Sequence, residues 1–284
     1  MPRRSLPPLS PDQVIALFDA LLTNADALLR SADVILQDGQ VQLARSLAIL
    51  GLEESGKAIA LHDRRVAMAY RPEGESFVDE QLAQLWLSHR KKLETVHRFL
   101  LEERYWFGTG PTEPTPDLVM STIVDWADEK NDHKQQGFYV DVDLGTGVAR
   151  GPQDPVDPVA VADVLDRVHQ IGWQLRLGQH IEASRQDGEA KGVEPASEDM
   201  LADWTKSLHD GGVEPEHLSL IIDGMREGVP GRALNNDGYR YVLPGPDASA
   251  FENVGKPGYE AQDRELRRLW REVAPTKESE PPLG

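Results

Sequence analysis

Apolar residues recur every three or four positions along most of the chain, which is the spacing of amphipathic helices. The first helix follows Ser10-Pro11-Asp12, where a capping residue, a proline and an acid favour a helix start. It runs for about six turns and ends at Asp38-Gly39. Its core-facing positions are apolar: Val14, Leu17, Phe18, Leu21, Leu22, Ala25, Leu28, Leu29, Ala32, Ile35 and Leu36.

Three more helices follow with the same periodicity. The second reaches about Tyr70, the third runs from Ser76 to Arg104 and the fourth from Asp117 to about Lys134. Because short connections make consecutive helices antiparallel neighbours, the pattern predicts an antiparallel four-helix bundle. Apolar and acidic residues then alternate over 138–143, which predicts an extended segment or a small hairpin at the end of the bundle.

The second half of the chain has shorter and more widely spaced elements. They are a fifth helix at 157–184, a linker at 186–195, short helices at 197–208 and 214–226, a candidate strand at 239–243, and a last helix at 260–273 before a polar tail whose composition favours disorder. The sequence therefore predicts a mainly α protein. It has a bundle domain over 1–150 and a smaller helical region over 151–284 with little or no β-structure.

The second helix carries charge inside an apolar stripe. Glu54 and Lys57 follow Leu50 at helical spacing, and Glu53 also precedes Lys57 by one turn. One interpretation is a solvated face with ordinary surface ion pairs. The other is a buried polar node, because buried charges persist only when they are paired. We expect a largely buried Glu54–Lys57 pair that packs against the third helix near His89.

Composition narrows the possible functions. The chain has 284 residues, no cysteine and a formal net charge of -18, so thiol and cysteine–metal chemistry are excluded and a DNA-coating surface is disfavoured. No segment approaches the roughly 18 uninterrupted apolar residues of a membrane span. The N-terminus also lacks the apolar stretch of a secretory signal. We predict a cytoplasmic protein without a membrane partner.

The third helix has an unusually basic polar face. Arg90 and His97 are seven positions apart, so helix geometry places them two turns apart on nearly the same face. A guanidinium that binds phosphate and an imidazole that moves a proton together suit RNA cleavage by the 2'-hydroxyl. His89 and Lys92 form a second candidate pair. The alternative for both pairs is an ordinary basic helix face, and His89 also suits a core position.

A carboxylate-bridged metal site is the other chemistry that a helical bundle supports. Glu94 and His97 make one Glu-x-x-His motif, whereas the di-iron template needs two such motifs and two further glutamates. The other occurrence, Glu214-Pro215-Glu216-His217, lies in a turn region with a proline. No glycine pattern matches a nucleotide-binding loop. We predict no metal and no cofactor.

Three motifs in the first half resemble the abortive infection protein V (AbiV) family, whose helical domain is grouped with the HEPN superfamily. The first is Glu53-Glu54-Ser55-Gly56-Lys57 after an alanine- and leucine-rich helix. The second is His89 and Lys92, as His-x-x-Lys on the next helix. The third is Lys134 shortly before Gly137-Phe138-Tyr139-Val140-Asp141, which adds Tyr139 and Asp141 to the motif residues. All three occur in order within residues 15–145.

The resemblance implies a HEPN-like bundle and a role in defence against phage, in which infection triggers a response that stops phage multiplication. Many HEPN relatives are metal-independent ribonucleases with an arginine, four to six residues and then a histidine, and they often work as dimers. Arg90 and His97, with six residues between them, fit this spacing. The resemblance does not decide between that pair and the His89 and Lys92 pair.

Two functional hypotheses follow. The leading one is a homodimeric HEPN toxin that cleaves or binds RNA, with a phage-encoded protein as its activator. The alternative is a catalytically inactive interaction module that binds a phage protein or a translation component. The resemblance does not cover residues 160–284, which are candidates for sensing the trigger, binding a partner or restraining the toxin.

Overall fold

The computed structural model describes residues 6–102, 104–105, 122–152 and 155–243, together with 253, 255, 256, 258 and 259. The chain forms two compact units. The first contains the described residues of 1–65, 76–179 and 244–284, and the second contains 66–75 and 180–243. Helix dominates both units, so the prediction of a mainly α protein is confirmed.

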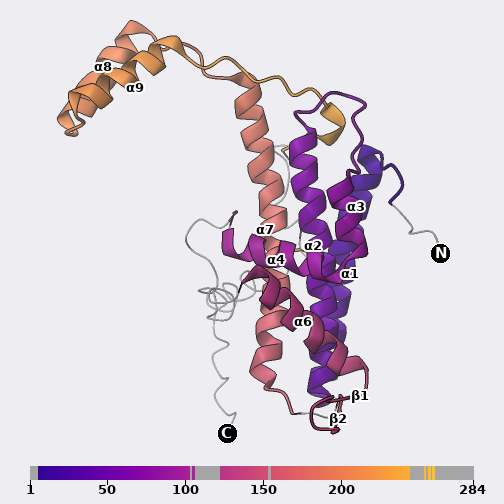
Figure 1. Cartoon of the computed structure of the whole chain (residues 1–284). Helices are drawn as coiled ribbons and strands as arrows, with labels where there is room; N and C mark the ends of the chain where they lie inside the picture. The colour runs from indigo at the N-terminus through magenta and orange to yellow at the C-terminus, as the bar shows by residue number, and fades with distance from the viewer. Residues whose placement is uncertain are drawn as a thin grey trace, which may run out of the picture. The chain divides into compact units, whose positions relative to one another are not determined.

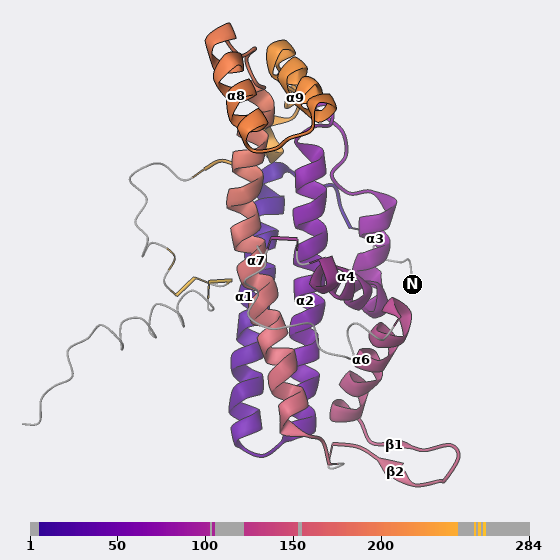
Figure 2. The ribbon, with the colours of Figure 1, turned by 90° about the vertical axis from the view of Figure 1, so that its left-hand side faces the viewer.

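Helix α1 (Pro11–Gln37) begins at the predicted cap. The Ser10 side chain accepts a hydrogen bond from the Gln13 backbone, and the Gln13 side chain accepts one from the Ser10 backbone. These two bonds satisfy amide groups that the first helical turn leaves unpaired. Gly39 has φ +81°, which suits glycine, and lets the chain reverse into α2 (Val41–Met68). The two helices run side by side in opposite directions (Figures 1 and 2).

The predicted third helix is wrong as a single element, because it is two helices. Helix α3 (Glu80–Leu87) ends at Ser88, whose φ of −119° and ψ of 115° are extended, and α4 (His89–Glu102) begins at the next residue. The Ser88 side chain accepts a hydrogen bond from the Lys91 backbone at 3.2 Å. A serine that caps a new helix in this way competes with continuation of the old one.

Helix α6 (Ile123–Phe138) corresponds to the predicted fourth helix and is capped by Thr122, whose side chain accepts a hydrogen bond from the Asp125 backbone. Residues 117–121 of that prediction lie outside the described part. After α6, strands β1 (Asp141–Val142) and β2 (Ala149–Arg150) pair antiparallel, which confirms the predicted hairpin.

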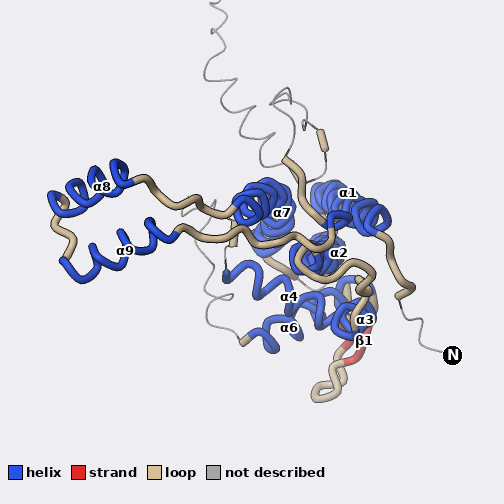
Figure 3. Tube along the Cα trace, turned by 90° about the horizontal axis from the view of Figure 1, so that it is seen from above, coloured by secondary structure: helices blue, strands red, loops and turns tan. Residues whose placement is uncertain are grey.

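Helix α7 (Pro158–Lys191) contributes its residues 158–179 to the first unit. Gly51 of α2 lies between Leu29 of α1 and Val168 of α7, so these three helices share one core. Figure 3, seen along the long helices, shows α1 and α7 on one side of α2, with α4 and α6 on the other. Helix α2 is therefore the central element. Among the described helices, none is long and apolar enough to cross a membrane.

The second unit contains the C-terminal end of α7 and the helical hairpin of α8 (Glu198–Asp210) and α9 (Pro215–Glu227). The linker predicted at 186–195 is wrong over its first half, since α7 continues to Lys191. Arg185 forms ion pairs with Glu182 and Glu189 of the same helix, which support that extension.

The candidate strand at 239–243 is not formed. A 3₁₀ turn, η1 (Asp237–Tyr239), precedes Tyr241, which packs in a small core with Val66 and Ala183. The Tyr241 backbone N–H donates a hydrogen bond to the Gln186 side chain at 2.9 Å. This N–H is therefore satisfied by a side chain and not by a neighbouring strand. The helix predicted at 260–273 lies outside the described residues.

Candidate functional site

A buried carboxylate joins three helices of the first unit. Glu53 of α2 is 3% exposed, and its Oε2 atom lies 2.5 Å from Nδ1 of His89 at the start of α4. Its Oε1 atom accepts a hydrogen bond from Nζ of Lys134 in α6. Nζ of Lys92, one turn after His89, lies 3.9 Å from Oε2. We call Glu53, His89, Lys92 and Lys134 the Glu53 cluster.

The Glu53 cluster places two ammonium groups on one carboxylate in a covered position. Lys92 is 8% exposed and Lys134 is 3% exposed. Burial lowers the pKa of Lys92, and the negative charges of Glu53 and Glu54 oppose that shift. Buried charges are retained only when each has a partner. The cluster therefore depends on Glu53, because that one carboxylate is the anion that both lysines contact.

Two small residues let the helices approach closely enough to build the cluster. A Cβ atom added to Gly56 of α2 would lie 2.4 Å from the Lys92 carbonyl oxygen, so any side chain there would push α4 away. On α6, a Cβ atom on Gly137 would lie 2.3 Å from the Gln42 carbonyl oxygen of α2. Ser46 strengthens this second contact, since its hydroxyl donates to the Lys134 carbonyl at 2.8 Å.

His89 is the member of the cluster that faces outward. Its side chain is 58% exposed, whereas the Glu53 side chain that holds it is 4% exposed. An ionised carboxylate only accepts hydrogen bonds, so Nδ1 is the protonated nitrogen and Nε2 of a neutral ring carries the free lone pair. A histidine oriented in this way presents one basic nitrogen at a fixed place.

The Glu54–Lys57 pair forms as expected but does not contact His89. Nζ of Lys57 lies 2.6 Å from Oε1 of Glu54, and the two side chains are 15% and 18% exposed. The ring of Trp86 in α3 covers Lys57, with Nζ 5.3 Å from the ring centroid. The carboxylate that reaches His89 is Glu53. Helical spacing pointed to the neighbouring glutamate.

Arg90 and His97 do not share an exposed surface. The Arg90 side chain is 53% exposed and its Nε donates to Glu94 at 2.9 Å. His97 is 1% exposed, with its ring centroid 5.3 Å from that of Trp126 in α6. Both residues follow the predicted spacing, but Trp126 of α6 packs on His97, whereas Arg90 stays half-exposed. The difference in burial therefore comes from a neighbouring helix.

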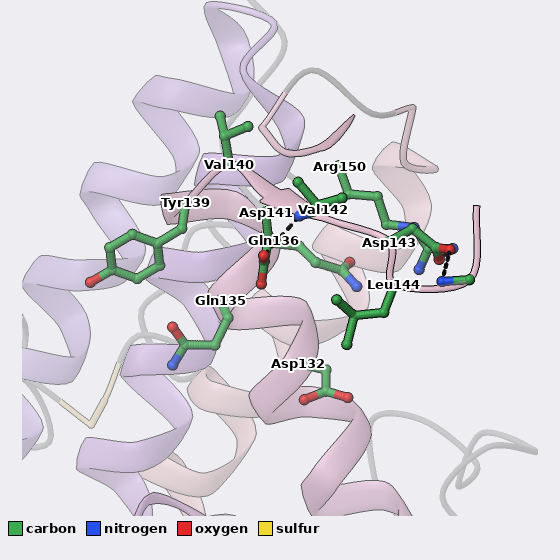
Figure 4. Close-up of a pocket in the computed structure, with 11 residues that line it drawn as sticks. Asp132, Gln135, Gln136, Tyr139, Val140, Asp141, Val142, Asp143, Leu144 and Arg150 are labelled. Carbon is green, nitrogen blue, oxygen red and sulfur yellow. Dashed lines mark hydrogen bonds and ion pairs between the residues drawn. The ribbon is translucent and has the colours of Figure 1, made fainter. Parts of the chain in front are cut away.

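Tyr139 and Asp141 line a separate pocket beyond the end of α6. The pocket has a volume of about 700 Å³ and is bounded by α6 and the β-hairpin (Figure 4). Tyr139 is 64% exposed. The Thr146 side chain and backbone donate hydrogen bonds to the Asp143 carboxylate, and these bonds hold the turn of the hairpin. The same bonds lower the pKa of the Asp143 carboxyl. Of the three residues taken from the third motif, Lys134 alone belongs to the Glu53 cluster.

The carboxylates of the bundle are a poor match for a metal centre. Glu53 is already paired with two lysines, and Glu94 is paired with Arg90. A neighbouring ammonium group repels a metal cation. Within the described residues, no three histidine or carboxylate side chains are grouped as metal ligands would be.

Sequence reasoning missed the packing residues of the site. Gly56 and Gly137 both stand inside the quoted motifs, and a glycine in a helix usually weakens it. A glycine in a helix despite this loss of stability indicates that another helix packs closely against it. Ser46 gave no comparable signal, because its role depends on where α6 arrives.

The fold and the Glu53 cluster together define a helical domain in which one buried glutamate orders side chains of two further helices. The family model described as AbiV matches residues 13–173, which is more than half of the chain. The chain belongs to the AbiV family. This membership indicates a role in abortive infection. No curated protein and no solved structure matches the sequence.

Proposed function

We propose that the protein is an abortive-infection effector that cleaves RNA at a site centred on His89. One observation carries this proposal: an exposed imidazole is held through Nδ1 by a buried, lysine-paired carboxylate, at 2.5 Å. Carboxylates that hold histidines in this way set the tautomer and stabilise the imidazolium. This arrangement suits a general base better than a surface histidine without a partner.

Each member of the cluster has a role in this proposal. Glu53 positions His89, and the covered ammonium groups of Lys92 and Lys134 hold Glu53 in place. Arg90, the exposed neighbour of His89, binds the RNA phosphate through its guanidinium. Its ion pair with Glu94 breaks when the phosphate binds. The formal net charge of -18 restricts RNA to such a local basic region at the start of α4.

The reaction is an attack by the RNA on itself. The 2'-hydroxyl gives its proton to Nε2 of His89, its oxygen bonds to phosphorus, and the bond from phosphorus to the 5'-oxygen breaks. The 5'-oxygen then needs a proton from a second acid. We assign that role to the same histidine of a second copy in a homodimer. The products carry a 2',3'-cyclic phosphate and a 5'-hydroxyl.

A catalytically inactive interaction module is the second candidate. The burial of both lysines favours it, since the Lys92 and Lys134 side chains are 10% and 4% exposed and do not reach a bound phosphate without a rearrangement. In that case the cluster fixes the bundle, and a protein partner binds elsewhere on its surface.

Sequencing of RNA ends separates these candidates. The full chain is incubated with bacterial RNA in excess chelator, and the parent is compared with His89→Asn and Lys91→Gln. Both variants remove a basic group from the start of α4, but Lys91 contacts Gln84 rather than Glu53. Loss of a general base costs roughly 10²- to 10⁴-fold in rate, so His89→Asn should lose cyclic-phosphate ends and Lys91→Gln should keep them. A parent that protects against phage without cleaving RNA would favour the interaction module.

A further inference from the structure

The hairpin of α8 and α9 carries several large apolar side chains that are exposed. Leu201 of α8 and Ile222 of α9 are buried. Met200 and Trp204 of α8 and Ile221 of α9 are between 41% and 51% exposed. Large apolar side chains that gather on a surface mark binding sites more often than isolated ones do.

Met200, Trp204 and Ile221 lie on one face of the hairpin, whereas Leu220, 71% exposed, lies about 160° around α9 from Ile222. The two helices pack antiparallel (Figures 2 and 3), and their buried apolar residues are Leu201 and Ile222. At 3.6 residues per turn, Trp204 lies about 60° from Leu201 and Ile221 about 100° from Ile222, both to the same rotational side of their own helix. Two antiparallel helices turn those sides toward the same face. Met200 is one turn before Trp204, so it extends this apolar face along α8.

The base of the hairpin is closed by main-chain hydrogen bonds. Val193 and Val229 exchange two bonds of 2.8 Å each, and the Ala196 backbone donates to the Met225 carbonyl at 2.9 Å. Gly228 has φ +68°, and a Cβ atom there would lie 2.5 Å from the Val193 carbonyl oxygen. The helices are thus tied at their base, and the apolar face is formed before any partner binds.

The charge around this face selects the partner. Residues 194–229 contain nine acidic and two basic side chains, a formal net charge of −7 with histidines neutral. Asp203 and Glu227, both exposed, belong to this set. Two copies of such a surface repel each other, whereas a cationic partner is attracted and steered to it.

We propose that the apolar face of the α8–α9 hairpin binds a positively charged amphipathic helix of a partner protein. The partner's apolar residues pack on Trp204, Met200 and Ile221, and its lysines or arginines approach the acidic residues around them. A helix in an apolar groove is a common form of peptide recognition, and tryptophan is frequent among the residues that dominate such binding. This inference is independent of RNA cleavage at His89.

Fluorescence anisotropy with a synthetic helix tests the proposal. The probe is a labelled peptide of leucine and lysine at amphipathic spacing, about five helical turns long. A peptide of the same composition in scrambled order and one with glutamate for lysine serve as probe controls. The full chain should bind the first probe, more weakly as salt rises, and bind the two controls at least about tenfold more weakly.

Variants locate the binding on the hairpin. Trp204→Ala and Ile221→Ala should each weaken binding of the amphipathic probe by about tenfold or more. Leu144→Ala, which removes an apolar side chain that is 99% exposed on the β-hairpin, should leave it unchanged. Circular dichroism checks that each variant keeps its helices. If one of the two hairpin variants does not fold, the other alone locates the binding.

Two results would overturn this inference. Equal binding by the parent and both hairpin variants would mean that the probe adsorbs to the acidic protein in general. Self-association of the parent that Trp204→Ala abolishes, without binding of the cationic probe, would assign the face to a second copy of the chain.

Discussion

Nδ1 of His89 lies 2.5 Å from Oε2 of Glu53, although His89 is more than half exposed and Glu53 is buried. The contact joins the surface of the bundle to a charge in its interior. Glu53 is held in turn by Lys134 and Lys92 from two other helices. Any change in this carboxylate therefore affects both the packing of the helices and the orientation of the exposed ring.

Glu53→Gln should destabilise the fold and inactivate the site. Glutamine is neutral, so the variant leaves the buried ammonium groups of Lys92 and Lys134 without an anion, and breaking a buried pair from one side costs about 3 to 5 kcal/mol. The melting temperature and the urea midpoint should both fall. Glu54→Gln is the matched control, because its pair with Lys57 is less buried and lies within one helix, so its loss should cost less than the loss of Glu53. Equal losses in the two variants would contradict the central role of Glu53.

Gly56→Ala should separate α2 from α4. The added methyl group would lie 2.4 Å from the Lys92 carbonyl oxygen, and overpacking of this kind costs about 1 to 3 kcal/mol. Gly188 in α7 provides the control, since nothing lies within 4 Å of a Cβ atom there and alanine favours a helix. Urea unfolding should show Gly56→Ala below the parent and Gly188→Ala at or above it. The reverse order would show that the close contact is not required.

The sequence predicted most helices because their apolar periodicity extends over many turns. It did not predict the break at Ser88, where no proline or glycine interrupts the pattern and a serine cap begins the new helix. The extension of α7 through Gly188 was missed for a similar reason, since glycine in a helix is unfavourable but not forbidden.

The candidate site was predictable in its residues but not in its contacts. Glu53 and Glu54 are adjacent in the sequence and differ by about 100° around the helix, so small differences in packing decide which of them reaches His89. The burial of His97 depends on Trp126, which arrives from another helix. Spacing along one helix contains no information about that neighbour.

Acid should destabilise the protein through His62. Burial lowers the pKa of His62 to about 3 from an ordinary value of 6.5, with the ring near the Tyr105 hydroxyl at 2.8 Å. The unfolded chain binds the proton first, so this contribution to stability is complete above pH 6.5 and is lost as the pH falls toward 3. At pH 5 the loss is roughly 2 kcal/mol.

Urea unfolding between pH 8 and pH 5 measures that loss. His62→Phe keeps an aromatic ring at this position without a titrating group and should show a weaker dependence on pH. His209→Gln, which changes an exposed histidine, should follow the parent. If His62→Phe and the parent lose stability equally, other groups account for the acid sensitivity.

A homodimer that shares its catalytic histidines should be inhibited by inactive chains. Each proposed site needs one His89 as base and a second as acid, so a mixed dimer of parent and His89→Asn lacks a complete site. Sedimentation at micromolar concentration should show the mass of two chains. Adding His89→Asn in excess should lower the RNase activity of the parent, whereas adding the same amount of heat-denatured His89→Asn chains should not. A pure monomer that cleaves RNA would contradict the shared site.

His89 and His97 should differ in what their loss does to the protein. His89 is exposed and oriented by Glu53, so His89→Asn should abolish RNA cleavage and phage protection while the melting temperature changes little. His97 is packed against Trp126 in the core of α4 and α6, so His97→Asn should lower the melting temperature. Its activity should fall only in proportion to the fraction of the variant that is unfolded. Arg90→Lys should impair cleavage, because an ammonium group does not reproduce the fork of the guanidinium. A folded and stable His97→Asn variant without activity, alongside an active His89→Asn variant, would move the catalytic role to Arg90 and His97.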